Sequence, residues 1–337
     1  MYRKRATLFL ISVILLALLF YSLDFDKFFE ITSSISIGWF VMLVFIQLVT
    51  LFLMSARWYI VIRRYGVSLL NVVQTSMIGF MVNNLTPMSL AGGEPIRAYV
   101  ISKIDNIKIE KAFATVFVDL FISLVPALAI NLIAVILVFK NSLDVRLAWI
   151  LAIIGFIIIA LFGAALGIIF SKDHSLRAFN KILGVFARVS YLKKYVRQIE
   201  EQVEELFSSF HNSIRTTITD KTTLFYGILL SSFTWILTLL RVYFIFLAVG
   251  VPIDFEIVVI VYAVLVTVSL LPILPGALGM WEWIGTGMFH YFGVSLEAAA
   301  AIVVIDRILF YWIPIALGGV SSIHVGFSIA KLMDMKD

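Results

Sequence analysis

Six long apolar stretches constrain the fold of this chain more than any other feature. A helix needs about 20 apolar residues to cross the hydrocarbon core of a bilayer, and each stretch provides roughly that length. Three of them carry no charged residue, two carry only Asp119 or Arg241, and the last carries Asp306 and Arg307. Because apolar residues run on without alternating, β-strands are excluded as the main element. The stretches are 6–23, 35–56, 112–139, 147–170, 222–249 and 298–322.

The composition agrees with a membrane location. The 337 residues are 62% hydrophobic and 14% charged, whereas a soluble domain carries about 25% charged residues. A single soluble core stops growing near about 250–300 residues, so the apolar solvent must be a bilayer. This excludes a soluble enzyme, a nucleic-acid-binding domain and a disordered chain. The chain has no cysteine, its four histidines have no metal-site spacing, and it lacks an ATP-binding lysine loop, so no cofactor is expected.

Two further apolar stretches, 67–82 and 257–271, are shorter and run into proline- and glycine-rich segments that break helices. Basic residues mark the cytoplasmic face, and Arg3, Lys4 and Arg5 place the amino terminus there. If 67–82 enters the membrane halfway and returns, the basic residues after it stay on the same face. The flanks of 257–271 contain no lysine or arginine, as an external loop should. We therefore predict an all-α polytopic membrane protein with about six full transmembrane helices, two re-entrant broken-helix hairpins and both termini in the cytoplasm.

Three sequence blocks occur twice in the same order, at offsets of 184, 188 and 187 residues. The predicted topology gives the two copies opposite orientations, which is an inverted repeat of the kind found in secondary transporters. We place repeat one at about 35–139 and repeat two at about 222–322 in a single transmembrane domain, 1–337, with a cytoplasmic amphipathic segment at about 171–221 between them. A duplication kept only for packing stays open. The blocks start at Arg57 and Arg241, at Pro87 and Pro275, and at Glu110 and Glu297.

Each repeat contains an arginine, a hairpin glutamate and a helix aspartate at membrane depth. A charge there costs about 2.5–3.5 kcal/mol, so it usually faces a partner or a wet cavity. One interpretation is two polar half-sites, one open to each leaflet, whose arginines grip phosphate and whose hairpin backbone approaches a headgroup. The other is that Arg57–Asp119 and Arg241–Asp306 are buried ion pairs that fix helix contacts. The residues concerned are Arg57, Gly92, Gly93, Glu94, Arg97 and Asp119, and Arg241, Pro275, Glu282, Asp306 and Arg307.

Five tryptophans lie near the predicted ends of spans, where an aromatic belt is expected, and most are predicted to be interfacial anchors. They are Trp58, Trp149, Trp281, Trp283 and Trp312.

The segment 83–103, with its Asn-Leu-x-Pro and Gly-Gly-Glu-Pro-x-Arg patterns, resembles the flippase-like membrane region of lysylphosphatidylglycerol synthetases. The segment 271–282, followed by Asp306 and Arg307, is also similar to that region, and the resemblance covers about 5–325. It implies movement of a lipid between leaflets, often one with a modified or glycosylated headgroup. No lysyl-transfer domain is expected, because the chain ends at Asp337. By resemblance, the motif positions are Gly92, Gly93, Glu94, Arg97, Pro275, Gly279, Glu282 and Arg307.

These observations favour a flippase- or scramblase-like lipid transporter without its own ATPase, acting on a lipid with an anionic or phosphate-containing headgroup. Two alternatives remain at this stage. One is a membrane-embedded transferase in which Glu94 or Glu282 is a general base. The other is a non-catalytic membrane partner of a separate glycosyltransferase or synthetase.

Overall fold

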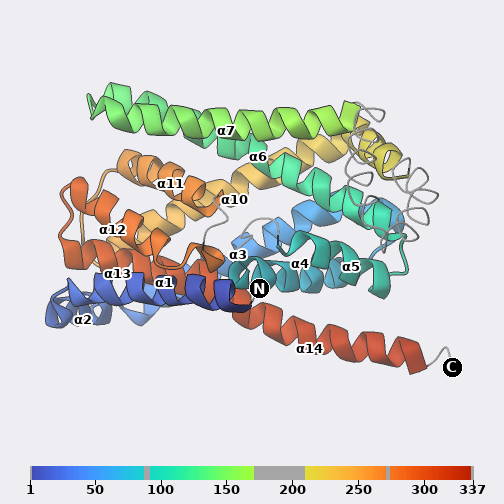
Figure 1. Ribbon diagram of the computed structural model, residues 1–337, viewed down its shortest axis with the longest axis horizontal. Helices are drawn as coiled ribbons and strands as arrows, with labels where there is room; N and C mark the ends of the chain where they lie inside the picture. The colour runs from blue at the N-terminus through green and yellow to red at the C-terminus, as the bar shows by residue number, and fades with distance from the viewer. Residues whose placement is uncertain (1, 87–91, 171–208, 271–273, 335–337) are drawn as a thin grey trace.

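The computed structural model describes residues 2–86, 92–170, 209–270 and 274–334, which form helices and turns with no strand among them. Most of the predicted amphipathic segment at 171–221 lies outside these residues, although 209–219 are helical. The first half contains α1 (Tyr2–Tyr21), α2 (Phe25–Ser33), α3 (Ile37–Ile62), α4 (Leu69–Leu85), α5 (Glu94–Ile104), α6 (Ile109–Lys140) and α7 (Val145–Phe170), as Figure 1 shows.

The second half contains α10 (Lys221–Ala248), α11 (Phe255–Leu270), α12 (Met280–Tyr291), α13 (Leu296–Arg307) and α14 (Ile313–Asp334). A π-helical turn, Ile308–Trp312, joins α13 to α14. The carboxylate of Asp220 caps the start of α10, and hydrogen bonds from the hydroxyl and the backbone N–H of Thr223 lower the pKa of that carboxyl.

Within the described residues, four helical segments are long and apolar enough to cross a membrane: Ile37–Tyr65, Ile109–Lys140, Lys221–Ala248 and Leu296–Gly326. They cover four of the six predicted spans. The described part of the chain is all-helical, and the protein is a multi-pass membrane protein. The other two predicted spans coincide with α1 and α7, whose qualifying apolar stretches are shorter. The full count of six therefore stays a prediction.

Both predicted hairpins contain a helix break. α4 ends at Leu85 and α5 begins at Glu94, while α11 ends at Leu270 and α12 begins at Met280. Gly276 and Gly279 adopt φ angles of +53° and +83°, a left-handed region that glycine enters without steric cost. In each pair the two arms pack against each other. Whether they re-enter a membrane stays a prediction.

The two halves of the described chain pack reciprocally. Helix α3 lies along α10, α4 packs against α14, and α6 packs against α11. We call the parts of the structure that correspond to repeats one and two the first and second segments. The helices α4 and α11 occupy the same place in their segments, as do α6 and the α13–α14 helix. Each segment therefore contacts the other in the same way. A two-fold relation produces such an arrangement.

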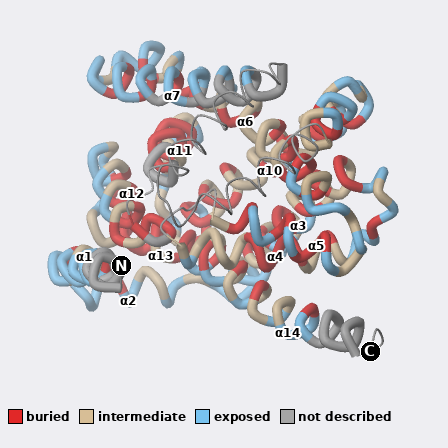
Figure 2. The backbone as a smooth tube through the Cα atoms, turned by 45° about the vertical axis from the view of Figure 1, so that its right-hand side comes forward, coloured by how far each residue is buried: buried red, intermediate tan, exposed pale blue. Residues whose placement is uncertain are grey.

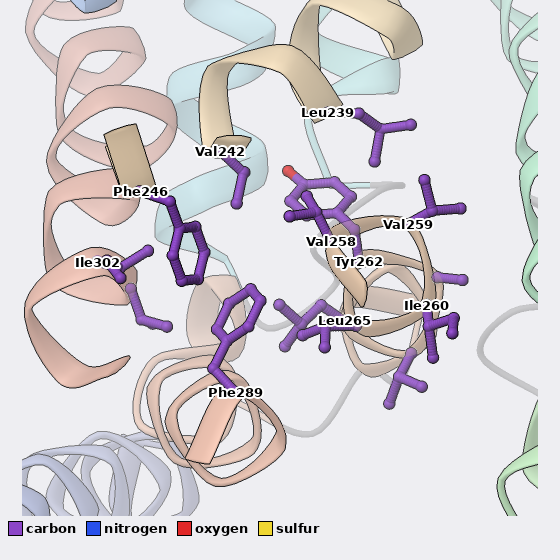
Figure 3. Close-up of a cluster of buried hydrophobic side chains, with 14 of the residues drawn as sticks. Leu239, Val242, Phe246, Val258, Val259, Ile260, Tyr262, Leu265, Phe289 and Ile302 are labelled. Carbon is purple, nitrogen blue, oxygen red and sulfur yellow. The ribbon is translucent and has the colours of Figure 1, made fainter. Parts of the chain in front are cut away.

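Buried side chains concentrate where α10, α11, α12 and α13 meet, whereas α7 is largely exposed (Figure 2). In this core the rings of Phe246 and Phe289 pack edge to face, with centroids 4.9 Å apart (Figure 3). Residues 298–301 are four consecutive alanines, all buried, and their small side chains let neighbouring helices approach closely. Large apolar side chains such as Phe156 and Val320 are exposed, as expected of helices that face lipid.

Candidate functional site

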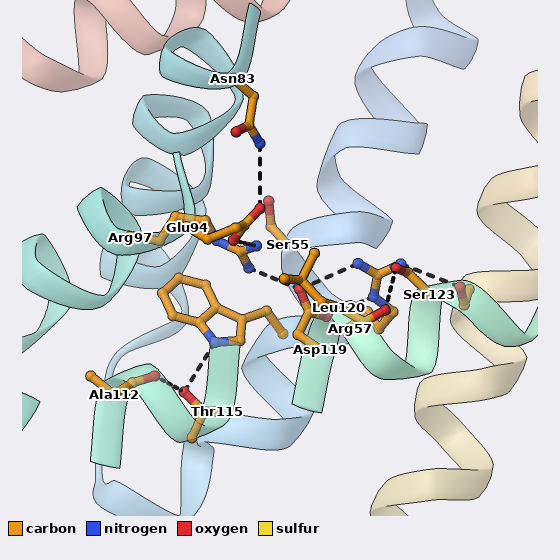
Figure 4. Close-up of polar contacts among 12 residues, drawn as sticks. Ser55, Arg57, Asn83, Glu94, Arg97, Ala112, Thr115, Asp119, Leu120 and Ser123 are labelled. Atoms are coloured by element: carbon orange, nitrogen blue, oxygen red, sulfur yellow. Dashed lines mark hydrogen bonds and ion pairs between the residues drawn. The ribbon is translucent and has the colours of Figure 1, made fainter. Parts of the chain in front are cut away.

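The charged residues of the first repeat form one buried cluster, the first charge cluster: Arg57 from α3, Glu94 and Arg97 from α5, and Asp119 from α6 (Figure 4). Asp119 accepts hydrogen bonds from Arg57 Nε at 2.7 Å and Arg57 Nη2 at 3.3 Å. It also accepts one from Arg97 Nη2 at 2.9 Å. Arg97 Nη1 donates to Glu94 Oε2 at 2.8 Å. One aspartate thus holds two arginines, and the cluster is neutral overall.

Uncharged side chains complete this cluster. The guanidinium of Arg97 lies 4.2 Å above the ring of Trp58. The indole nitrogen of Trp58 donates to Thr115 Oγ1 at 3.2 Å, and Asn83 Nδ2 donates to Glu94 Oε1 at 3.3 Å. Trp58 is fully buried beneath an arginine, so the prediction that it anchors an interface is wrong.

The second charge cluster contains Arg241 from α10, Glu282 from α12, and Asp306 and Arg307 from α13. Arg241 donates from Nε and Nη2 to Asp306 Oδ1, at 3.0 and 2.7 Å. Arg307 Nε donates to Glu282 Oε1 at 2.7 Å. Trp281 is also buried, with the guanidinium of Arg307 5.5 Å from its ring, so it is not an interfacial anchor. Trp149, Trp283 and Trp312 remain exposed.

The two clusters have the same composition but are built differently. Asp119 and Asp306 are related by the 187-residue offset, yet the position matching Arg307 is Leu120. Likewise, the position that matches Arg97 at the 188-residue offset is Gly285. The second arginine therefore comes from α5 in one segment and from α13 in the other. The same chemistry is reached through non-equivalent residues.

Two hydrogen bonds, one from each cluster, link the clusters to the opposite helix of the α3–α10 pair. Arg57 Nη1 donates to Ser231 Oγ at 3.2 Å, and Arg241 Nη1 donates to Gln47 Oε1. The 184-residue offset that relates Arg57 to Arg241 also relates Gln47 to Ser231. These reciprocal bonds require α3 and α10 to run antiparallel. Sequence reasoning missed Gln47 and Ser231, although the offset could have identified them.

Both clusters border a single cavity of about 300 Å³ between the two segments. Arg57, Arg97, Arg241 and Arg307 line it, and Glu94 is the one acidic residue of the described chain that does so. Asp119, Glu282 and Asp306 are buried and do not contribute to the lining. The cavity therefore presents cationic groups, with most of their counter-charges placed behind them. Uncharged polar side chains share the lining: Gln47, Thr50, Asn83, Asn84, Ser123, Thr234, Thr238 and Tyr262.

The two predicted half-sites border the same cavity. Their opening to opposite leaflets stays a prediction. Both ion pairs, Arg57–Asp119 and Arg241–Asp306, are present, and both arginines also line the cavity. Ion pairing and ligand contact are therefore compatible for these arginines. No group of three or more histidine or acidic side chains in the described residues could hold a metal ion.

The hairpin residues have structural roles. Gly92 is half-buried just before α5, and Pro275 begins the short turn Pro275–Ala277. The N–H of Gly93 donates to Asn83 Oδ1 at 2.6 Å, and that of Gly279 donates to Glu282 Oε2 at 2.7 Å. These N–H groups of the half-helix starts are therefore bonded within the chain, and the charged donors that line the cavity are the arginines.

The close contact of Gly93 with α4 gives a testable prediction. A Cβ at Gly93 would overlap the carbonyl oxygen of Gly79. We expect Gly93→Ala to lower the free energy of unfolding in detergent by about 1–3 kcal/mol through overpacking. Gly287→Ala is the matched control, because nothing lies within 4 Å of its added Cβ. Equal stability of the two variants would contradict the close helix approach.

Comparison with known proteins identifies the chain's relatives. The family described as the lysylphosphatidylglycerol synthase TM region matches residues 6–318. The chain belongs to this family. A UPF0104 membrane protein of Methanothermobacter thermautotrophicus is 30% identical over 99% of both chains. UPF0104 membrane proteins of Pyrococcus horikoshii and Methanocaldococcus jannaschii are 25% and 24% identical, over 94% and 97% of this chain and 96% and 97% of their own. The family match confirms the resemblance drawn from 83–103 and 271–282.

Proposed function

We propose that this lysylphosphatidylglycerol synthase TM family member transports a lipid between leaflets, with an anionic, phosphate-containing headgroup passing through the cavity. The observation that carries the proposal is the convergence of four arginines, two from each segment, on that cavity. Arginine grips phosphate oxygens through paired N–H donors. The family description, which names a lipid synthase's membrane region, supports a lipid-related function.

The arginines retain capacity for a ligand. Arg97 Nε is buried and has no hydrogen-bond partner among the described residues, and the same is true of the indole nitrogen of Trp281. Both residues line the cavity. A buried donor without a partner is costly and calls for an explanation. A phosphate or headgroup oxygen bound in the cavity would satisfy such donors.

A path for lipid headgroups also needs access from both sides of the membrane. The antiparallel pairing of α3 with α10 supports two segments of opposite orientation that share one central site, an arrangement typical of secondary transporters. In this proposal both termini lie in the cytoplasm. The headgroup crosses between the segments while the hydrocarbon tails stay in lipid, and transport proceeds without an ATPase in this chain.

The transferase alternative is less well supported. A general base needs a carboxylate that is free to take a proton. Glu94 lines the cavity, but its Oε2 is paired with Arg97 and its Oε1 accepts from Asn83. Glu282 is bonded to Arg307 and to the N–H of Gly279 and does not line the cavity. Both carboxylates are thus engaged in positioning arginines.

Reconstitution into liposomes tests the proposal. With labelled phosphatidylglycerol and phosphatidylcholine in one leaflet, we expect the anionic lipid to cross faster than in protein-free vesicles. The choline lipid should be unaffected, because the arginines that line the cavity repel its quaternary ammonium. Arg57→Gln should slow the anionic lipid by about tenfold or more, since a hydrogen bond to a charged group contributes about 1.5–3 kcal/mol. Arg146→Gln is the matched control, because its side chain is 88% exposed. Transport that ignores both headgroup charge and Arg57 would refute the proposal.

A further inference from the structure

The end of α4 and the break that follows it contact the second break and the π turn Ile308–Trp312. Four residues make this contact, which we call the break contact: Asn84, Thr86, Gly276 and Tyr311. Asn84 Nδ2 donates to the Tyr311 carbonyl at 3.1 Å, and Tyr311 Oη donates back to the Asn84 carbonyl at 3.0 Å. Gly276 N–H donates to the Thr86 carbonyl at 3.4 Å. Residues from the two segments, more than 180 positions apart, are thus joined by reciprocal bonds.

The break contact is closely packed. A Cβ at Gly276 would overlap the ring of Tyr311 and the Asn84 carbonyl oxygen, so only glycine fits there without a shift of its neighbours. Tyr311 lies in the π-helical turn Ile308–Trp312. Such turns are rare and often occur at functional sites.

The π turn distinguishes the two segments. Pro126 follows Asp119 by seven residues in α6, whereas Pro314 follows Asp306 by eight. The extra residue falls within the stretch that contains the π turn. A π turn accommodates such an insertion inside a continuous helix. The helix α6 is α-helical throughout Ile109–Lys140, so the tyrosine of the break contact belongs to a π turn that α6 lacks.

Arg307 connects this contact to the cavity. Its Nη2 donates to the Gly276 carbonyl at 2.6 Å, and its guanidinium lies 4.6 Å above the ring of Tyr311. Asn84, Gly276 and Arg307 all line the cavity. The break contact therefore forms part of the cavity wall, and the Arg307 side chain contacts both the break contact and the cavity.

We propose that the break contact is a gate that closes this wall of the cavity, and that an anion bound by Arg307 opens it. This inference rests on the proposed function, because it takes the phosphate of the headgroup as the anion. A phosphate oxygen competes with the Gly276 carbonyl for the Arg307 donors, and it adds the attraction of an opposite charge and paired acceptor oxygens, which the neutral carbonyl lacks. Once Arg307 turns to the ligand, Gly276 and Tyr311 lose the guanidinium that holds them together.

Cysteine cross-linking tests the gate, because the natural chain contains no cysteine. In Asn84→Cys/Tyr311→Cys, mild oxidation should join the end of α4 to the π turn across the break contact and abolish transport, and a reductant should restore it. Phosphatidylglycerol vesicles should slow the cross-linking. At ten times the dissociation constant, the ratio of the closed state, which excludes the lipid, to the open state falls about tenfold. Inorganic phosphate alone and phosphatidylcholine vesicles are the comparison probes, and an effect of free phosphate would show that the anion acts without a lipid tail.

The control pair is Lys140→Cys/Glu256→Cys, which replaces an exposed ion pair of 2.6 Å between α6 and α11 away from the cavity. Its cross-linking should not depend on any of the three probes. Tyr311→Phe, which loses only the Oη donor, should increase transport. The gate is overturned if positions 84 and 311 do not cross-link, if the cross-linked protein transports as fast as the protein treated with reductant, or if no anion slows the cross-linking. Cross-linking is measured without transport, so failure of the transport proposal is seen separately.

Discussion

Replacing Asp119 by asparagine is expected to destabilise the protein by about 3–5 kcal/mol, because it leaves buried arginines without their counter-charge. Asp119 is fully buried and bonds to both Arg57 and Arg97. In the substituted protein, Glu94 is left to balance two guanidinium groups. Asp306→Asn removes an acid that bonds only to Arg241 in the described chain, so we expect a smaller loss.

Reversible unfolding in mixed detergent measures these free energies. Arg241→Gln/Asp306→Asn should be more stable than Asp306→Asn alone, because removing both partners leaves no uncompensated charge. Arg146→Gln removes an arginine whose ion pair is 3.9 Å long and exposed, and an exposed pair contributes only about 0–1 kcal/mol. If Asp119→Asn were no more harmful than Arg146→Gln, the first charge cluster would not hold its helices together.

Much of this arrangement follows from the sequence because charges in a membrane are expensive and few. Arg57, Asp119, Arg241 and Asp306 could be predicted as a matched set from their spacing alone, and both ion pairs are present. The glycines and prolines predicted the helix breaks, since few other residues stop an apolar helix. Local chemistry determines these features, so one sequence is enough to find them.

Features that depend on packing between distant helices could not be predicted in the same way. Gln47 and Ser231 are uncharged, and nothing local marks them as partners of Arg241 and Arg57 until α3 and α10 are known to run antiparallel. Trp58 looks like an interfacial tryptophan until Arg97 is placed over its ring. The shared cavity is likewise a property of both segments together, so neither segment predicts it alone.

Combining Arg57→Gln with the pair Arg241→Gln/Asp306→Asn should reduce transport of the anionic lipid by about 100-fold. This is the product of two tenfold losses, since the effects of distant independent sites add in free energy. Gln47, which accepts a hydrogen bond from Arg241, lies ten residues from Arg57 on α3. This places the two arginines about 15 Å apart along the helix axis. Asp306→Asn is added to Arg241→Gln to keep the second charge cluster neutral. Arg57→Gln needs no such partner, because it leaves Asp119 paired with Arg97.

The single variants decide between a two-segment path and a one-sided site. If the headgroup passes both arginines, Arg57→Gln and Arg241→Gln/Asp306→Asn should each slow transport. Asp306→Asn alone, with Arg241 kept, shows how much of the loss in the Arg241→Gln/Asp306→Asn variant comes from removing Asp306. A transferase with one catalytic carboxylate would instead depend on residues of one segment. Only proteins whose detergent unfolding shows them to be folded enter the comparison. Transport that survives loss of one of the two arginines but not of the other would contradict passage through both segments and favour a binding site within one of them.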